Sequence, residues 1–276
     1  MDEPTLNAIV TLRNQVSPWL MVLQVVPDGW ELPEFVSGQA ITLGLPGSAS
    51  RCDLAEPENS PADPDKLIRH MYSIASSPVN RLFLEFYIAL VPDGKLTPRL
   101  FNLKIGDRIW MSEKAAGTFT LEQVPQDADV ILVATSSGLA PYISMLSTHL
   151  KVMGKRRVAV LHSVRHSWDL GYRSILMTMQ HLRDNFTYVP LVSRLQQEPV
   201  PWQGAAGHIQ DLWKNGTMDR IWGFHPTPEN THIFLCGGAN MIEEMAALLA
   251  QDGFKESTPK DPGQIHAARW WKKAVG

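Results

Sequence analysis

The pattern of apolar residues changes near residue 125, and this change limits the folds open to the chain. Before it, short β-prone stretches such as 19–26 and 40–45 end at turn residues, the first at Pro27-Asp28-Gly29. After it, continuous apolar runs alternate with amphipathic stretches. Closely spaced short strands are typical of an antiparallel barrel, whereas strands alternating with helices are typical of a doubly wound parallel sheet. The sequence therefore predicts two domains.

The first domain, residues 1–125, is predicted to be an antiparallel β-barrel. Further strands are expected at 82–91, 107–111 and 118–121, and in the segment Arg69-His70-Met71-Tyr72-Ser73. Residues 48–66 are rich in Ser, Ala, Pro and acidic side chains with little apolar periodicity. We interpret this segment as a solvated loop.

The second domain, residues 126–276, is predicted to be an α/β doubly wound parallel sheet. Its apolar runs are typical of strands that are buried on both faces. The expected strands are 129–134, 157–164, 186–192 and 232–236. The expected helices are 141–152, 170–184 and 240–251.

Composition excludes several classes of protein. The 276 residues are 44% hydrophobic with a net charge of −3, enough to form two cores but without the dense basic face that nucleic acid requires. Cys52 and Cys236 cannot form a disulfide framework or a zinc motif, which favours a reducing cytoplasm. The N-terminus lacks the pattern of a secretory signal, and no apolar run approaches the roughly 18 residues of a membrane span.

Two segments of the first domain could bind a nucleotide cofactor. Tyr72 beside Ser73, with a cation upstream, could pack a phenol on a planar ring and offer a hydroxyl to it. Thr97 followed by Pro98 is typical of a helix N-cap, where anions bind. The alternatives are a half-buried Tyr in a plain strand and an ordinary cap.

In the second domain, chemistry-bearing residues follow the predicted strands. The small residues between Ala134 and Pro141 could admit a pyrophosphate, although no GxGxxG motif is present. Arg165 and Arg194 follow two strands where a 2′-phosphate could be bound. Cys236 ends the last predicted strand. The alternatives are a plain turn, solvated arginines and a small buried hydrophobe. No metal site is predicted.

The order of these segments resembles the ferredoxin/flavodoxin-NADP reductase family, in its compact bacterial form. The resemblance runs through nearly the whole chain. It is strongest in Leu84–Tyr87, Pro92–Leu100, Leu103–Asp107, Ala115–Gly117, Val192–Arg194 and Leu235–Gly237 with Met241.

The resemblance implies an FAD-binding barrel and an NADP-binding sheet, with Tyr72 on the isoalloxazine and Ser73 close to flavin N5. Ser73 and Cys236 are the implied catalytic residues. The residues implied to contact FAD are Arg69, His70, Met71, Tyr72, Ser73, Tyr87, Ile88, Ala89, Leu90, Lys95, Leu96, Thr97, Ser137 and Trp271. Those implied to contact NADP are Thr135, Ser136, Val164, Arg165, Ser193, Arg194, His208, Gly237, Gly238, Ala239 and Met241.

The chain departs from the family pattern at three positions. His70 replaces an Arg, so either Arg69 or His70 meets the FAD diphosphate. Ser136 replaces a Gly, which could crowd the pyrophosphate. His208 replaces an Arg near the 2′-phosphate, which would make NADPH preference depend on pH. At the C-terminus, Trp271 is favoured over Trp270 as the residue that stacks on FAD.

The implied function is an FAD-dependent oxidoreductase that exchanges hydride with NADPH and single electrons with ferredoxin or flavodoxin. We expect a cytoplasmic monomer. Three alternatives stay open: the reductase component of a separate oxygenase system, an NADPH-dependent flavin reductase, and a flavin-binding sensor or assembly subunit that transfers no hydride. The physiological electron acceptor is left open by the sequence.

Overall fold

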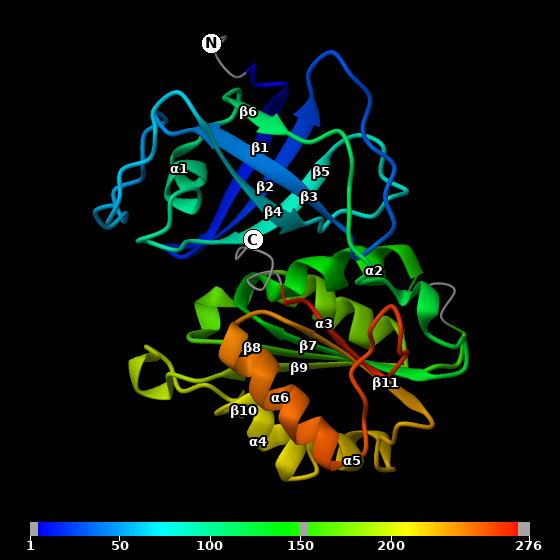
Figure 1. Cartoon of the computed structure of the whole chain (residues 1–276). Helices are drawn as coiled ribbons and strands as arrows, with labels where there is room; N and C mark the ends of the chain where they lie inside the picture. Colours follow the sequence, from blue (N-terminus) through cyan, green and yellow to red (C-terminus); the bar gives the residue numbers. More distant parts are fainter. Residues whose placement is uncertain (1–4, 150–153, 270–276) are drawn as a thin grey trace. The chain divides into compact units, whose positions relative to one another are not determined.

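The computed structural model describes residues 5–149 and 154–269 and divides into two compact units (Figure 1). One unit comprises the chain up to Leu121 together with helix α2 (Ala140–His149). The other comprises Glu122–Leu139 and the chain that follows α2. The domain boundary expected after residue 125 lies close to the position between Leu121 and Glu122, where the chain first passes from one unit to the other. Helix α2, expected in the second domain, packs within the first unit.

The first unit is a six-stranded antiparallel sheet of order β4-β3-β6-β1-β2-β5. Its strands are β1 (Ala8–Ser17), β2 (Leu20–Pro27), β3 (Ala40–Pro46), β4 (Leu67–Ser73), β5 (Leu84–Ala89) and β6 (Arg108–Met111). A bridge between Ile74 and Phe86 connects the end of β4 to β5. The barrel-type antiparallel fold is therefore confirmed. The strand predicted at 118–121 is wrong, because Leu121–Gln123 form a 3₁₀ helix, η1.

The core of this unit follows the alternation of its strands. Every second residue of β2 and β3 faces inward, and short helix α1 (Thr97–Asn102) adds two more apolar side chains. The fully or nearly fully buried members include Met21, Leu23, Val25, Ile41, Leu43, Leu45, Leu100 and Phe101.

The loop 48–66 contains no helix or strand, as expected, but it is not wholly solvated. Glu58 lies 2.5 Å from Nη1 of Arg99 (α1), whose side chain is only 5% exposed. Arg99 also donates from Nη2 to the carbonyl oxygen of Gly47, 2.6 Å away. The Arg99 hydrogen bond lowers the pKa of the Glu58 carboxyl. The loop is therefore anchored by a buried ion pair that composition did not reveal.

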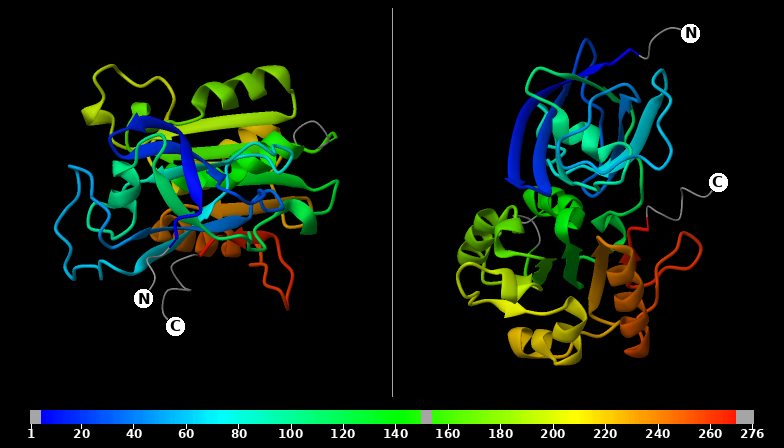
Figure 2. Two further views of the ribbon diagram at one scale, coloured as in Figure 1. Left: turned by 90° about the horizontal axis from the view of Figure 1, so that it is seen from above. Right: turned by 90° about the vertical axis from the view of Figure 1, so that its left-hand side faces the viewer.

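The second unit is a parallel sheet of order β10-β9-β8-β7-β11-β12. Its strands are β7 (Asp129–Thr135), β8 (Val158–Val164), β9 (Phe186–Val192), β10 (Ala205–Ala206), β11 (Thr231–Cys236) and β12 (Ile265–Ala267). Its helices are α3 (Arg173–Leu182), α4 (Ile209–Lys214), α5 (Thr217–Trp222) and α6 (Ala239–Gln251). Helix α3 covers one face of the sheet and α4–α6 cover the other (Figure 1 and Figure 2). The predicted doubly wound sheet is confirmed.

The connections of this sheet place a switch point between β7 and β11. The chain runs outward from β7 through β8 and β9 to β10, and then returns to add β11 on the other side of β7. In open α/β sheets, ligands bind beyond the carboxyl ends of the strands at such a point. Within the described residues, no helix has both the length and the apolar character needed to cross a bilayer.

Candidate functional site

In the first unit, strand β4 carries the Tyr72-Ser73 pair at its carboxyl end. Register with β3 sets which way these side chains face: Ile41 is opposite Tyr72 and Leu43 is opposite His70. Because successive side chains of a strand point to opposite faces, Tyr72 and His70 share one face of β4 and Ser73 lies on the other. On the shared face Tyr72 is half-buried against the core, whereas His70 is largely exposed. Strand β4 is at the edge of the sheet, so within residues 5–149 and 154–269 one row of its backbone groups has no strand partner.

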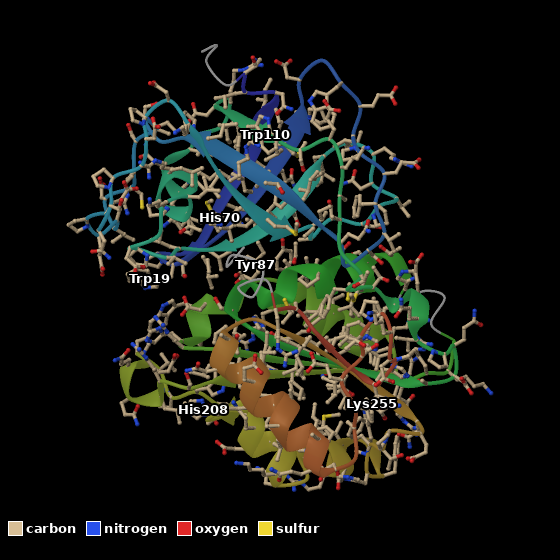
Figure 3. The ribbon with its side chains drawn as sticks, viewed as in Figure 1. Trp19, His70, Tyr87, Trp110, His208 and Lys255 are labelled. Carbon is tan, nitrogen blue, oxygen red and sulfur yellow. The ribbon has the colours of Figure 1, made fainter. Side chains whose placement is uncertain are left out.

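Arg69 lies on the opposite face of β4 from Tyr72. Its guanidinium carbon stands 4.6 Å from the centroid of the Trp110 ring. Gly44 of β3 separates the two, and a Cβ there would stand 3.2 Å from Arg69 Cγ and 3.3 Å from Trp110 Cε3. His70 is therefore the basic residue on the same face of β4 as Tyr72. Figure 3 labels His70 and also Trp110, the ring on which Arg69 lies. Burial lowers the pKa of His70, which favours the neutral ring at pH 7.

The remaining barrel candidates divide between buried and exposed positions. Tyr87, Ile88, Leu90 and Leu96 are buried, Ala89 is half-buried, and Met71 and Lys95 are exposed. The expected N-cap at Thr97 is wrong. Its hydroxyl instead accepts from the Val91 N–H (2.9 Å) and donates to the Val91 carbonyl oxygen (3.2 Å). Thr97 therefore closes the turn before α1 and does not cap the helix.

The geometry at β4 fits a planar aromatic cofactor with polar edges. Tyr72 is half-buried against the core, and burial raises the pKa of its phenol, so the ring is neutral. An exposed strand edge beside it offers backbone donors and acceptors to such a ring. A flavin has this shape and this polarity.

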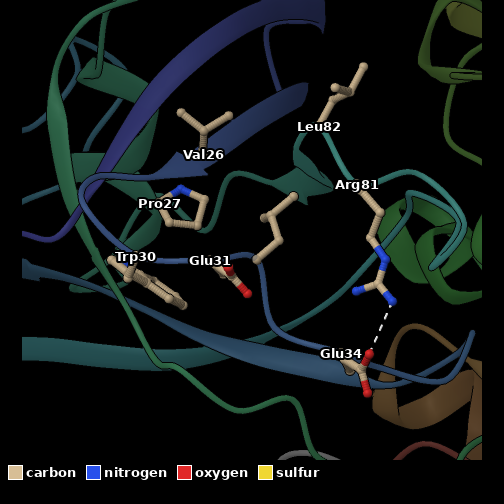
Figure 4. A pocket seen from close by; sticks show the side chains of 8 residues that line it. Val26, Pro27, Trp30, Glu31, Glu34, Arg81 and Leu82 are labelled. Atoms are coloured by element: carbon tan, nitrogen blue, oxygen red, sulfur yellow. Dashed lines mark hydrogen bonds and ion pairs between the residues drawn. The ribbon is translucent and has the colours of Figure 1, made fainter.

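A separate cavity in the first unit does not fit a dinucleotide. It has a volume of about 570 Å³ and is lined by Val26, Pro27, Trp30, Glu31, Leu32, Glu34, Arg81 and Leu82 (Figure 4). Its one cation, Arg81, is paired with Glu34 at 3.1 Å, and Glu31 adds a second carboxylate. A diphosphate would meet net negative charge there.

In the second unit, the ends of β7 and β11 are joined at the switch point. Thr135 Oγ1 accepts a hydrogen bond from the Gly238 N–H at 2.8 Å. Gly237 has φ +140°, and a Cβ there would lie 2.1 Å from Thr135 Oγ1. A Cβ on Gly138 would lie 2.2 Å from the Cys236 carbonyl oxygen. Because glycine has no side chain, Gly138 and Gly237 allow the backbone segments after β7 and β11 to approach each other closely.

Ser136 adopts the left-handed backbone conformation that glycine adopts most readily, with φ +50°. His162 in β8 supports it, because its Nε2 lies 3.1 Å from the Ser136 carbonyl oxygen. Burial lowers the pKa of His162 to about 4, so the ring is neutral and donates from Nε2. The Tyr188 hydroxyl, 3.4 Å from Nδ1, supplies the other partner. Ser137, next in the turn, is half-buried.

Arg165 and Arg194 lie at the carboxyl ends of neighbouring strands and are exposed. A backbone hydrogen bond joins them: the Arg194 N–H donates to the Arg165 carbonyl oxygen, with 2.9 Å between nitrogen and oxygen. Ser193 donates from both N–H and Oγ to the Val164 carbonyl oxygen. His208, also exposed, precedes α4, and its N–H donates to Asp211. The structure thus brings Val164, Arg165, Ser193 and Arg194 together.

Cys236 ends β11 next to the Thr135 turn, and it is only 4% exposed. Burial raises the pKa of its thiol to about 12, so the sulfur stays protonated at pH 7. Ala239 begins helix α6, and Met241 within its first turn is buried. Trp270 and Trp271 lie outside the described residues. The sequence placed Gly138 only within the small-residue turn, and it did not predict that His162 supports this turn; a histidine inside an otherwise apolar strand was the available signal for His162.

An antiparallel barrel with a half-buried tyrosine on its edge strand, followed by a doubly wound sheet with close-packed glycines at its switch point, is typical of two-domain flavin- and nicotinamide-dependent oxidoreductases. Residues 132–247 match the family model of the oxidoreductase NAD-binding domain. The chain is 30% identical to a flavodoxin/ferredoxin-NADP reductase of Escherichia coli over 76% of its length and 77% of that protein. It is also 30% identical to a ferredoxin-NADP reductase of Pseudomonas aeruginosa, over 81% of each chain. This chain belongs to the ferredoxin/flavodoxin-NADP reductase family.

A solved structure shares the fold over nearly all of both chains. A ferredoxin NADP⁺ reductase from Neisseria gonorrhoeae, solved with bound FAD and NADP, superposes with a TM-score of 0.78. It covers 95% of this chain and 97% of that one, at 23% sequence identity. The two-domain architecture is therefore that of the family.

Proposed function

We propose that this chain is an FAD-dependent ferredoxin(flavodoxin)-NADP reductase. It exchanges hydride with NADPH and single electrons with ferredoxin or flavodoxin. The observation that carries the proposal is the switch-point turn, where Gly138 leaves no space for a side chain against the Cys236 carbonyl. Such a turn brings backbone N–H groups within reach of a pyrophosphate. Residues 1–125 are the proposed FAD domain and residues 126–276 the proposed NADP domain.

Tyr72 and Ser73 are the proposed flavin contacts that matter most for the reaction. The bound FAD supplies the chemistry, because a flavin accepts a hydride and releases electrons one at a time. The neutral phenol of Tyr72 packs against the ring system, and the Ser73 hydroxyl donates to a ring nitrogen. Because His70 and not Arg69 shares the Tyr72 face, His70 is the proposed neighbour of the diphosphate. A neutral imidazole there binds the diphosphate through a hydrogen bond without a permanent charge.

Cys236 is proposed to line the nicotinamide side of the site. Its buried, protonated thiol adds no charge where a hydride moves, and its bulk excludes water. Thr135 and the glycines after Cys236 hold the two strand ends in register. These residues orient the dinucleotide and leave the redox step to the cofactors.

Arg165 and Arg194 are proposed to bind the 2′-phosphate of NADPH. Both residues are exposed, and among the described residues neither forms an ion pair with a carboxylate. No acidic side chain stands directly after β8, where an NAD-preferring sheet places one for the ribose hydroxyl. Two free cations on joined loops suit a phosphate through charge-assisted bonds.

The defining experiment is anaerobic titration of the purified holoenzyme. We expect a flavin absorption band that NADPH bleaches quickly and NADH bleaches slowly, followed by reduction of ferredoxin or flavodoxin. The double variant Arg165→Ala/Arg194→Ala should lose NADPH affinity by about 1.5 to 3 kcal/mol per contact and keep its affinity for NADH. A protein without flavin, or with a flavin that NADPH leaves oxidised, contradicts the proposal.

The electron partner is proposed to be a small acidic carrier, ferredoxin or flavodoxin. Turnover with each carrier, measured side by side with NADPH and NADH, identifies which one is used. Docking through charge predicts that carrier reduction slows as salt rises. Rates independent of salt would argue against a charged interface. Free Cys52 and Cys236 suit the reducing cytoplasm that we propose as the location.

A further inference from the structure

The loops after β8 and β9 are joined by side chains as well as by backbone. The first, residues 165–169, carries Arg165, and the second, residues 194–198, carries Arg194. One backbone bond joins the two arginines directly. The residues of the second loop are exposed apart from half-buried Glu198, so packing against the core does little to fix its position. Hydrogen bonds to the first loop are then what holds it in place.

His166 makes the principal side-chain contact between these loops. Its Nε2 lies 2.6 Å from Gln197 Oε1 on the second loop. Its Nδ1 lies 3.2 Å from Asp169 Oδ2 on its own loop. The ring stacks on the Trp168 indole at 4.5 Å and 5°, and only 9% of the residue is exposed. The ring is therefore fixed from three directions, and one of them is the other loop.

The His166 ring thus contacts Gln197 on the second loop and Asp169 on its own loop, one through each ring nitrogen. Asp169 is itself only 4% exposed, so its contact with the ring is shielded from water. Glu198 accepts the Ser167 N–H at 2.8 Å and adds a second tie between the loops. Charge-assisted bonds of this kind are stronger than neutral ones.

We propose that His166 is a positioning residue for the choice between NADPH and NADH. Its bond to Gln197, here called the loop clasp, holds the Arg194 loop beside Arg165 so that both guanidinium groups meet one phosphate. The inference rests on the proposed function, because it assumes that these arginines bind the 2′-phosphate. Without the clasp, the Arg194 loop must be ordered when the ligand binds, and that entropy is lost from the affinity. A ligand without the 2′-phosphate gains nothing from the clasp.

Binding of two nucleotides by calorimetry tests the loop clasp in the holoenzyme. The probes are adenosine 2′,5′-bisphosphate and 5′-AMP, which differ by the 2′-phosphate. The main variant is Gln197→Ala, because Gln197 is exposed and its removal leaves the folded core intact. Gln196→Ala is the matched control, because it removes a neighbouring exposed side chain outside the clasp.

We expect Gln197→Ala to weaken the bisphosphate roughly fivefold, the effect of one hydrogen bond, and to leave 5′-AMP unchanged. Gln196→Ala should bind like the parent protein. His166→Phe, which keeps the stacking on Trp168, should reproduce the loss. The ratio of kcat/KM for NADPH to that for NADH should fall in the same variants.

The arginine variants separate the two levels of the argument. If Arg165→Ala and Arg194→Ala weaken the bisphosphate but Gln197→Ala does not, the phosphate site stands and the clasp is overturned. If the arginine variants also bind normally, the phosphate site and the clasp are both overturned. Equal losses for both nucleotides in Gln197→Ala would mean a general structural role and would likewise overturn the selectivity role.

Discussion

The Ser136 carbonyl oxygen lies 3.1 Å from Nε2 of His162, a histidine that is fully buried in the parallel sheet. The bond requires a proton on Nε2, and because burial lowers the pKa of His162 to about 4, the ring carries that proton in its neutral form at pH 7. The left-handed Ser136 turn is thus supported by a group that acid would charge. The consequence is a pH-dependent stability.

Stability should fall as the pH is lowered from about 6.5 towards 4. Unfolded His162 takes up a proton near its ordinary pKa of 6.5, and folded His162 only near 4, so the unfolded state binds more protons in this window. Linkage then predicts a loss of about 2 to 3 kcal/mol between pH 7 and pH 4.5 from this residue. Urea unfolding at several pH values measures it.

His162→Gln should reduce this slope with pH, even though the variant is less stable at pH 7. Burial also lowers the pKa of His266 to about 4, so this residue contributes its own share of the loss of stability at low pH. His266→Gln is therefore the matched variant, and it should keep the share of the pH dependence that comes from His162. If His162→Gln has the same slope as the parent protein, the buried ring is not the source of the effect.

Glu58→Ala should destabilise the first unit. The substitution leaves the Arg99 guanidinium buried beneath the loop without its carboxylate partner. Removing one member of a buried ion pair costs about 3 to 5 kcal/mol. The control is Glu34→Ala, which breaks an exposed pair with Arg81 and should change the free energy of unfolding by less than about 1 kcal/mol. Equal effects of the two variants would show that the Glu58 pair is no stronger than a surface pair.

Gly138→Ala should lower stability and weaken NADPH binding together. Its Cβ would come within 2.2 Å of the Cys236 carbonyl oxygen, so the two strand ends must separate. Overpacking of this kind costs about 1 to 3 kcal/mol. Gly238→Ala is the steric control for stability, since the nearest atom to its Cβ is Thr135 Oγ1 at 3.7 Å. Thermal unfolding and calorimetric binding of NADPH on Gly138→Ala should show both losses.

Cys236 should resist alkylation in the folded protein. Its thiol is buried and its pKa is about 12, so almost no thiolate is present at pH 8. In a Cys52→Ser variant, we expect iodoacetamide to label Cys236 only after denaturation, as judged by mass spectrometry. Rapid labelling of that variant in its native state would show that the strand end is open to solvent.

The sequence predicts best those elements whose pattern of apolar residues is compatible with only one kind of secondary structure and burial. Strands β7 and β8 are almost entirely buried, and their continuous apolar runs are incompatible with an exposed strand. Strand β1 was missed because Arg13, Asn14 and Gln15 interrupt its alternation. Strand β12 is three residues long and depends on pairing with β11, a contact that local sequence does not encode.

The site residues show the same division. The opposite orientation of Arg69 and His70 follows from the two-residue period of a strand, so parity with Tyr72 could have identified His70 from sequence. The role of Thr97 could not have been identified in this way, because its hydroxyl bonds to Val91 across a turn instead of capping its own helix. The loop clasp also depends on two loops that only the sheet order brings together.

Helix α2 follows the nucleotide turn in the chain but is bonded to the barrel. Ser144 Oγ donates to the Ser76 carbonyl at 2.7 Å, the Thr148 and Ser77 hydroxyls are 2.9 Å apart, and His149 Nε2 lies 2.9 Å from Ser37 Oγ. Gene fusions that exchange nicotinamide-binding halves between reductases at residue 125 would therefore give the barrel a foreign helix. A chimera that keeps residues 140–149 with the barrel preserves these native contacts and is the better starting point for engineering new coenzyme use.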